Sequence, residues 1–131
     1  MPEVRAFLLA VGILMVAAGT AVGIRQQGTV QQPDTAAITP AMVDLGRAIF
    51  HGKGTCFACH GQNLEGTQIA PTLKKHAWRD AKNGEFPNIF YVATHGVSGT
   101  LMVPFPGGIS NEEALAVASY VWSVGQGKAK P

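Results

Sequence analysis

The hydrophobic positions of this chain form one long uninterrupted run and several shorter, periodic ones. The long run, residues 6–24, reads AFLLAVGILMVAAGTAVGI and has no charge between Arg5 and Arg25. Because a bilayer-crossing helix needs about 20 apolar residues, the run predicts a transmembrane anchor within residues 1–25. A cleaved secretory signal is the alternative, since Gly19-Thr20-Ala21 offers small residues for cleavage. We favour the retained anchor because signal sequences carry only about 7–15 apolar residues.

The next segment, residues 26–38, reads QQGTVQQPDTAAI and shows no helical spacing of apolar residues. Its glutamines, with Gly28 and Pro33, are typical of a flexible connector. As a coil it would span roughly 20 Å. We therefore expect three parts: an anchor at 1–25, a flexible polar linker at 26–38 and a domain at 39–131.

Helical periodicity begins at Thr39, which is a good N-cap residue, and at Pro40, which suits the first helical position. Apolar residues then recur at helical spacing, and glycines at 52 and 54 end the pattern. The predicted apolar stripe consists of Met42, Leu45 and Ile49.

The C-terminal pattern also predicts a helix. Ser110 and Glu113 form the spacing of a capping box, and apolar residues continue to a stop near Gly125. A shorter helix is expected at about 86–95, within a loop-rich stretch. The domain is therefore predicted to be all-α.

The chemistry lies in Cys56-Phe57-Ala58-Cys59-His60, which reads C-x-x-C-H, the attachment motif of a c-type haem. Two thiols two residues apart can each add to a vinyl group of the haem, and the adjacent His60 can supply an imidazole nitrogen to the iron. The motif predicts one covalent haem c and a role in electron transfer.

Other readings of the two cysteines fit less well. A zinc site normally needs four ligands, and His51, His76 and His95 form no ligand pair with the usual spacing. A thioredoxin-like dithiol belongs to a βαβ pattern, which is missing here. The formal net charge of +2 argues against nucleic-acid binding. The domain is small enough that a buried haem would supply much of its core.

These features together resemble class I cytochromes c. In that family an N-terminal helix with a Gly-x-x-x-aromatic pattern crosses a C-terminal helix that carries an aromatic partner. Gly46 and Phe50 match the pattern, and Tyr120 matches the partner. The resemblance covers about residues 39–124 and implies a few helices around one covalent haem.

The resemblance also implies a methionine as sixth iron ligand. Met1 and Met15 belong to the anchor and Met42 precedes the haem motif, so Met102 is the candidate. Its surroundings, Met-Val-Pro-Phe, are similar to the methionine loop of the family, although Val103 stands where a proline often follows the methionine directly. An open iron, or ligation by His95, is the alternative.

Three further haem contacts are implied by the same resemblance. Ala70-Pro71-Thr72-Leu73 is similar to the family's Gly-Pro-x-Leu segment. Pro71 would accept a hydrogen bond from the axial His60, and Leu73 would pack on the haem face. Trp78 resembles an aromatic residue that donates to a haem propionate, with a core tryptophan as the alternative reading.

We therefore expect a membrane-anchored monohaem cytochrome that carries single electrons and is not an enzyme. Its partners would be redox proteins such as a quinol:cytochrome c reductase, a terminal oxidase or a photosynthetic reaction centre. A resident subunit of a larger electron-transfer complex is the alternative, and a haem gas sensor or peroxidase is a third. Haem attachment places the domain on the periplasmic side of a bacterial cytoplasmic membrane.

Overall fold

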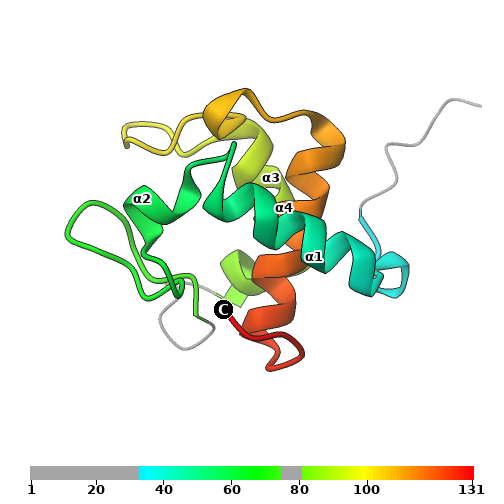
Figure 1. Ribbon diagram of the computed structural model, residues 1–131. Coiled ribbons are helices and arrows are strands. Elements are labelled where there is room, and N and C mark those ends of the chain that lie inside the picture. The colour runs from blue at the N-terminus through cyan, green and yellow to red at the C-terminus, as the bar shows by residue number, and fades with distance from the viewer. Residues whose placement is uncertain (1–32, 75–80) are drawn as a thin grey trace, which may run out of the picture.

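The computed structural model describes residues 33–74 and 81–131, and all regular structure in these residues is helical. The α-helices are α1 (Pro40–His51), α2 (Cys56–His60), α3 (Phe86–His95) and α4 (Asn111–Gly125), arranged as in Figure 1. Short 3-10 turns lie at Thr35–Ala37, Ala81–Gly84 and Pro106–Gly108. The expected all-α class is confirmed for the described residues.

The first helix begins and ends where the sequence predicts. The Thr39 hydroxyl accepts a hydrogen bond from the Met42 N–H at 3.2 Å, and Gly52 caps the other end. The predicted stripe is partly wrong, however, because Leu45 is 51% exposed. The helix instead buries the face that carries Gly46, Ile49 and Phe50.

That face is selected by the crossing of α1 and α4, which lie against each other in Figure 1. A Cβ on Gly46 would overlap the backbone oxygen of Ala116 and lie 2.9 Å from the Cβ of Tyr120. One turn further along α1, the Phe50 and Tyr120 rings meet edge to face, with centroids 5.6 Å apart. The close helix approach that the sequence predicts at Gly46 is therefore present.

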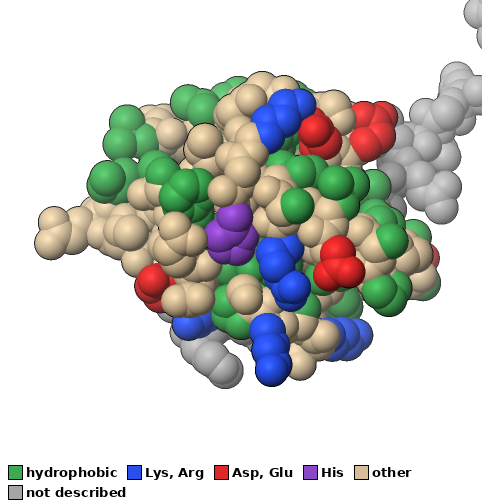
Figure 2. Space-filling view, viewed as in Figure 1, with side chains coloured by type: hydrophobic (Ala, Val, Ile, Leu, Met, Phe, Trp, Pro, Cys, Tyr) green, Lys and Arg blue, Asp and Glu red, His purple; other side chains and the backbone are tan. Residues whose placement is uncertain are grey.

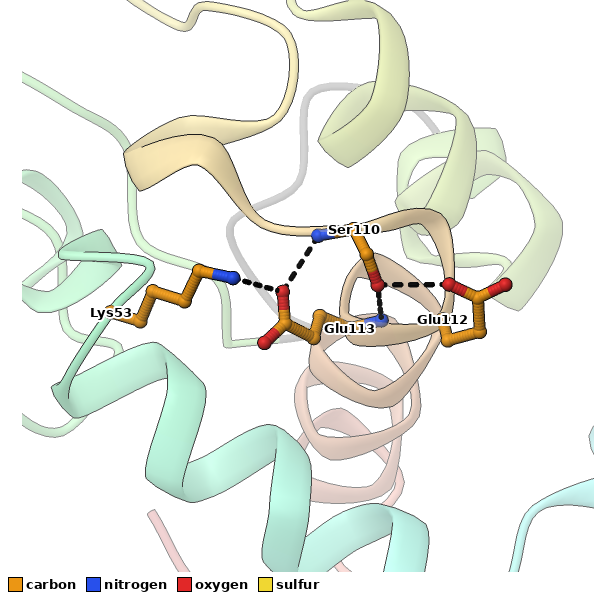
Figure 3. Close-up of polar contacts among 4 residues, drawn as sticks. All are labelled: Lys53, Ser110, Glu112 and Glu113. Carbon is orange, nitrogen blue, oxygen red and sulfur yellow. Dashed lines mark hydrogen bonds and ion pairs between the residues drawn. The ribbon is translucent and has the colours of Figure 1, made fainter.

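The capping box at the start of α4 is also confirmed, and Lys53 donates a further hydrogen bond to its glutamate (Figure 3). Oε2 of Glu113 accepts from the Ser110 N–H at 2.7 Å and from Nζ of Lys53 at 2.6 Å. The Ser110 hydroxyl accepts from the Glu113 N–H and donates to Glu112. The loop that leads into α2 is thus tied to the first turn of α4.

The third helix packs on α4 as well, with the Phe86 and Trp122 rings 6.2 Å apart. The buried hydrophobic core joins α1, α3 and α4 with Leu64 and Ile109 from the loops. It comprises Ile49, Phe50, Leu64, Phe86, Ile89, Ala93, Ile109, Ala114, Ala116, Val117, Ala118, Tyr120 and Val121.

The last residues of the expected linker carry structure in this domain. Thr35–Ala37 forms a 3-10 turn capped by Asp34, and Ile38 packs against the core. The predicted anchor at 6–24 lies outside the described residues. Within 33–74 and 81–131, no helix has the length and apolar character needed to cross a membrane.

Candidate haem site

The haem motif forms α2, a single helical turn between two residues with positive φ. Thr55 enters the turn at φ 51° and Gly61 leaves it at φ 85°. Cys56 and Cys59 are three apart, so they lie on the same side of the turn, and both are free thiols of intermediate exposure. His60 is 8% exposed. The three donors are therefore gathered on one short rigid element.

The His60 ring is oriented by the hydrogen bond that the resemblance implies. Nδ1 lies 2.8 Å from the Pro71 carbonyl oxygen. A carbonyl only accepts, so Nδ1 carries the proton and the Nε2 lone pair is left for a metal. Burial lowers the pKa of His60, against a smaller opposing effect of the Pro71 hydrogen bond. The ring is thus held in the neutral form that a metal requires.

The Cys56 thiol is held in its protonated form. Burial raises its pKa to about 11, and the neighbouring Cys59 adds to the rise. The thiolate is the reactive form in oxidation and metal binding, and burial disfavours it at Cys56. The two free thiols, the neutral His60 and their spacing fit a covalently attached haem.

Residues 61–74 fold back on α2 and present Pro71 to the histidine. Gly66 N–H donates to the His60 oxygen at 2.7 Å, and the Thr67 hydroxyl donates to the Cys59 oxygen at 2.7 Å. Leu64 is completely buried, and its oxygen accepts from the Leu73 N–H at 2.9 Å. The Pro71 carbonyl is therefore positioned by backbone hydrogen bonds of the chain itself.

Leu73 is half-buried and packs against the core, and the roles of Pro71 and Leu73 beside the haem stay predictions. Trp78 and His76 lie outside the described residues.

The candidate methionine lies on a loop fixed to the end of α3. Val97 N–H donates to the Met102 oxygen at 2.9 Å, and Phe105 N–H donates to the Ala93 oxygen at 2.9 Å. The Met102 N–H donates to the Thr100 hydroxyl at 3.1 Å. Met102 is half-buried. The loop conformation is set by these internal bonds, and ligation by Met102 stays a prediction.

His95, the alternative candidate for the sixth iron ligand, makes its contacts within α3. Its ring is exposed and stacks on the Tyr91 ring, with centroids 4.0 Å apart and planes at 11°. Nδ1 lies 3.0 Å from the Tyr91 oxygen and 2.8 Å from the Thr94 hydroxyl. These contacts hold the His95 ring along the surface of α3.

Apolar side chains are exposed on the methionine loop. We call Val97, Leu101, Val103 and Phe105 the apolar loop patch, and all four are exposed, Leu101 by 77%. Figure 2 shows hydrophobic side chains gathered at the upper left, over the loop drawn yellow in Figure 1. Ile69, in the segment before Pro71, is also exposed. Apolar side chains are therefore exposed both before Pro71 and on the methionine loop.

Two residues with positional roles were not identified from the sequence. Leu64 is completely buried in a loop at φ 59°, and no periodicity marks it. His51 is part-buried and lies between three aromatic rings, Phe50, Phe57 and Tyr120. The local sequence indicates only that His51 and Arg47, at i and i+4, lie one helical turn apart.

An all-helical domain with two free thiols and a neutral histidine on one turn defines a haem protein of the c type. A model of the cytochrome c family matches residues 43–125, more than half of the chain. The chain belongs to the cytochrome c family. The cytochrome c family binds covalent haem c, and Cys56, Cys59 and His60 of this chain fit its attachment motif.

Solved structures with a similar fold are also c-type cytochromes. Cytochrome cL from the marine methylotrophic bacterium Methylophaga aminisulfidivorans is 25% identical with a TM-score of 0.56, over 65% of this chain and 54% of its own. Cytochrome cL from Hyphomicrobium denitrificans is 24% identical with a TM-score of 0.52, over 61% and 45%.

A third similar structure is a reducing HAO-like protein complex from Kuenenia stuttgartiensis, 22% identical with a TM-score of 0.53, over 70% of this chain and 49% of that one. This chain therefore spans about half the length of these three solved proteins. No curated protein matches it.

Proposed function

We propose that this protein is a membrane-anchored monohaem cytochrome c that carries single electrons between redox proteins of a respiratory or photosynthetic chain. The observation that carries the proposal is the orientation of His60 by the Pro71 carbonyl, 2.8 Å from Nδ1. Bound haem c supplies an iron that gains and loses one electron. The chain's task is to hold that iron in one geometry and to exclude other ligands.

Each candidate residue has a part in that task. The thiols of Cys56 and Cys59 would hold the haem covalently, and His60 and Met102 would ligate its iron. A thioether ligand would raise the reduction potential. An iron ligated by protein atoms would supply one-electron transfer without binding a substrate, so the protein would act as a carrier and not as a catalyst.

The apolar loop patch is the surface through which a redox partner would dock. Exposed apolar side chains on a small domain commonly mark interaction sites, and these four flank Met102. The partners we propose are a quinol:cytochrome c reductase as donor and a terminal oxidase or photosynthetic reaction centre as acceptor.

We further propose that residues 6–24 span the bacterial cytoplasmic membrane once and keep the domain on the periplasmic side. The uncharged run of apolar residues supports this. The anchor contains glycines at 12, 19 and 23, and small residues allow close packing of membrane helices. Such packing against other membrane helices favours a second candidate function, that of a resident subunit in a larger electron-transfer complex.

A haem-stained native gel separates these functions. Membranes are extracted in mild detergent, beside a parallel high-salt wash. Haem that stays with the membrane and then runs alone supports a tethered shuttle. Haem that runs with a large assembly supports the resident subunit. Haem released by the salt wash alone would overturn the anchor, and rapid carbon monoxide binding to the reduced protein would overturn the role as a carrier.

A further inference from the structure

His51 is the last residue of α1, and both nitrogens of its ring lie beside backbone carbonyl oxygens. Nδ1 is 3.0 Å from the Arg47 oxygen, one helical turn earlier. Nε2 is 2.8 Å from the oxygen of Gln62, which follows the haem motif. The ring therefore bridges α1 and residues 61–74, the segment that presents Pro71 to His60.

The two contacts require two donors on the ring. A carbonyl oxygen only accepts hydrogen bonds, and a neutral imidazole carries a single N–H. In the neutral ring, one nitrogen lone pair would face an oxygen lone pair. The imidazolium cation carries two N–H groups and satisfies both oxygens. Hydrogen bonds from a charged donor are also about twice as strong as neutral ones, and a helix C-terminus favours a cation.

His95 provides the contrast, because it ends α3 as His51 ends α1. Its Nδ1 also lies 3.0 Å from a carbonyl oxygen one turn back, that of Tyr91. Its Nε2, however, has no hydrogen-bond partner among residues 33–74 and 81–131. One N–H on Nδ1 therefore satisfies His95, so its contacts do not require the charged form.

The His51 ring lies directly against the haem motif. It stacks on the Phe57 ring, with centroids 6.3 Å apart and planes at 18°, and Phe57 stands between the two haem-bearing cysteines. The described charged and titratable side chains on the surrounding elements are Asp44 and Arg47 on α1, Lys53 after it, Cys56, Cys59 and His60 on α2, Glu65 and Lys74 in the next segment, and Glu112, Glu113 and Tyr120 on α4.

None of the described carboxylates pairs with His51. Glu113 is paired with Lys53 at 2.6 Å, and Asp44 lies 3.9 Å from Arg47. The Arg47 guanidinium is placed over the Tyr120 ring, 5.4 Å from its centroid. Among the described residues, a charge on His51 would therefore have no paired carboxylate.

We propose that His51 is a positioning residue that acts in its doubly protonated form, clamping residues 61–74 to α1 and holding a positive charge beside α2. Loss of one proton breaks one of the two contacts and removes a charge that favours the reduced haem. The midpoint potential is therefore lower when the His51 ring carries one N–H than when it carries two. This role depends on the haem site and not on the anchor or the redox partner.

Potentiometric titration of the purified full-length holoprotein, in mild detergent between about pH 5 and 8 where histidine titrates, tests the proposal. His51→Gln keeps one donor but cannot take a charge, and His95→Gln is the matched control. We expect wild type and His95→Gln to share a pH-dependent fall in potential and His51→Gln to lose it. His51→Arg, a permanent cation, should hold the potential at the wild-type acidic value throughout. A His51→Gln profile identical to wild type overturns the proposal.

Proton–nitrogen correlation spectra of the reduced wild-type protein provide a second readout that needs no variant. At mildly acidic pH, we expect two slowly exchanging ring N–H signals from His51 and at most one from His95. A single protected N–H from His51 overturns the proposal, even if His51→Gln fails to take up haem.

Discussion

Replacing Gly46 with alanine should destabilise the domain, although alanine is the better helix former. An added Cβ at this position overlaps the Ala116 carbonyl oxygen and lies 2.9 Å from the Tyr120 Cβ. The oxygen belongs to the backbone of α4, so no rotation of a side chain relieves the overlap. The helices must separate, and the contact between the Phe50 and Tyr120 rings is disturbed.

Two opposing effects set the size of the change. Overpacking a tight core costs typically about 1–3 kcal/mol and sometimes more, and a clash with backbone belongs at or above the upper end. Replacing a helical glycine with alanine also stabilises the helix by about 1 kcal/mol through its higher helix propensity. We therefore expect Gly46→Ala to lower the free energy of unfolding by about 2 kcal/mol. In a domain of this size that lowers Tm by roughly 10 °C.

Denaturant unfolding of the holoprotein, followed by far-UV circular dichroism, measures this change. Ala48→Gly is the matched control, because Ala48 is an exposed residue of the same helix. It should lose only the propensity difference of about 1 kcal/mol. If Gly46→Ala is as stable as wild type, or more stable, the close approach at this crossing does not limit the fold and the reasoning is wrong.

Three other changes test the site and its supports. Met102→Ala should open the sixth position, lower the midpoint potential and allow rapid carbon monoxide binding by the reduced protein; slow binding with an unchanged spectrum would exclude Met102 as the ligand. The hydrogen bond from Lys53 and that from the Ser110 N–H hold the pKa of Glu113 below its usual 4.5. Ionised Glu113 therefore stabilises the fold at pH values above its ordinary pKa, and this contribution is lost as the pH falls below it. In Glu113→Gln, the free energy of unfolding should therefore fall less steeply on acidification than in wild type. Parallel pH profiles of the two proteins would contradict this. Leu101→Ser, at a highly exposed position, should leave unfolding unchanged within about 0.5 kcal/mol and slow electron exchange with the partner several-fold; an unchanged rate would contradict the docking role.

The helix boundaries could be predicted because their causes are local. The Thr39 hydroxyl and the Ser110–Glu113 capping box each act within three residues of the helix start. The buried face of α1 could not be read from periodicity alone, since Leu45 fits an apolar stripe and is exposed. The face is set by Gly46, whose importance depends on Ala116 and Tyr120, far away in sequence.

The same distinction applies to the haem site. The donors on α2 are adjacent in sequence and could be recognised directly. The hydrogen bond from His60 to Pro71 was expected from the family resemblance and is present. The buried position of Leu64 and the second contact of His51, with Gln62, were not foreseen, because both arise from the path of a loop that has no period.

The crossing of α1 and α4 also bears on the order in which the molecule matures. The first of these helices and the haem motif are synthesised well before the last helix, because the chain is made from its N-terminus. Until α4 exists, Gly46 and Phe50 have no surface to pack against, and closure of so long a loop is entropically costly. Until the crossing closes, the completed core does not surround Cys56 and Cys59, so a haem could reach both thiols before the domain is closed.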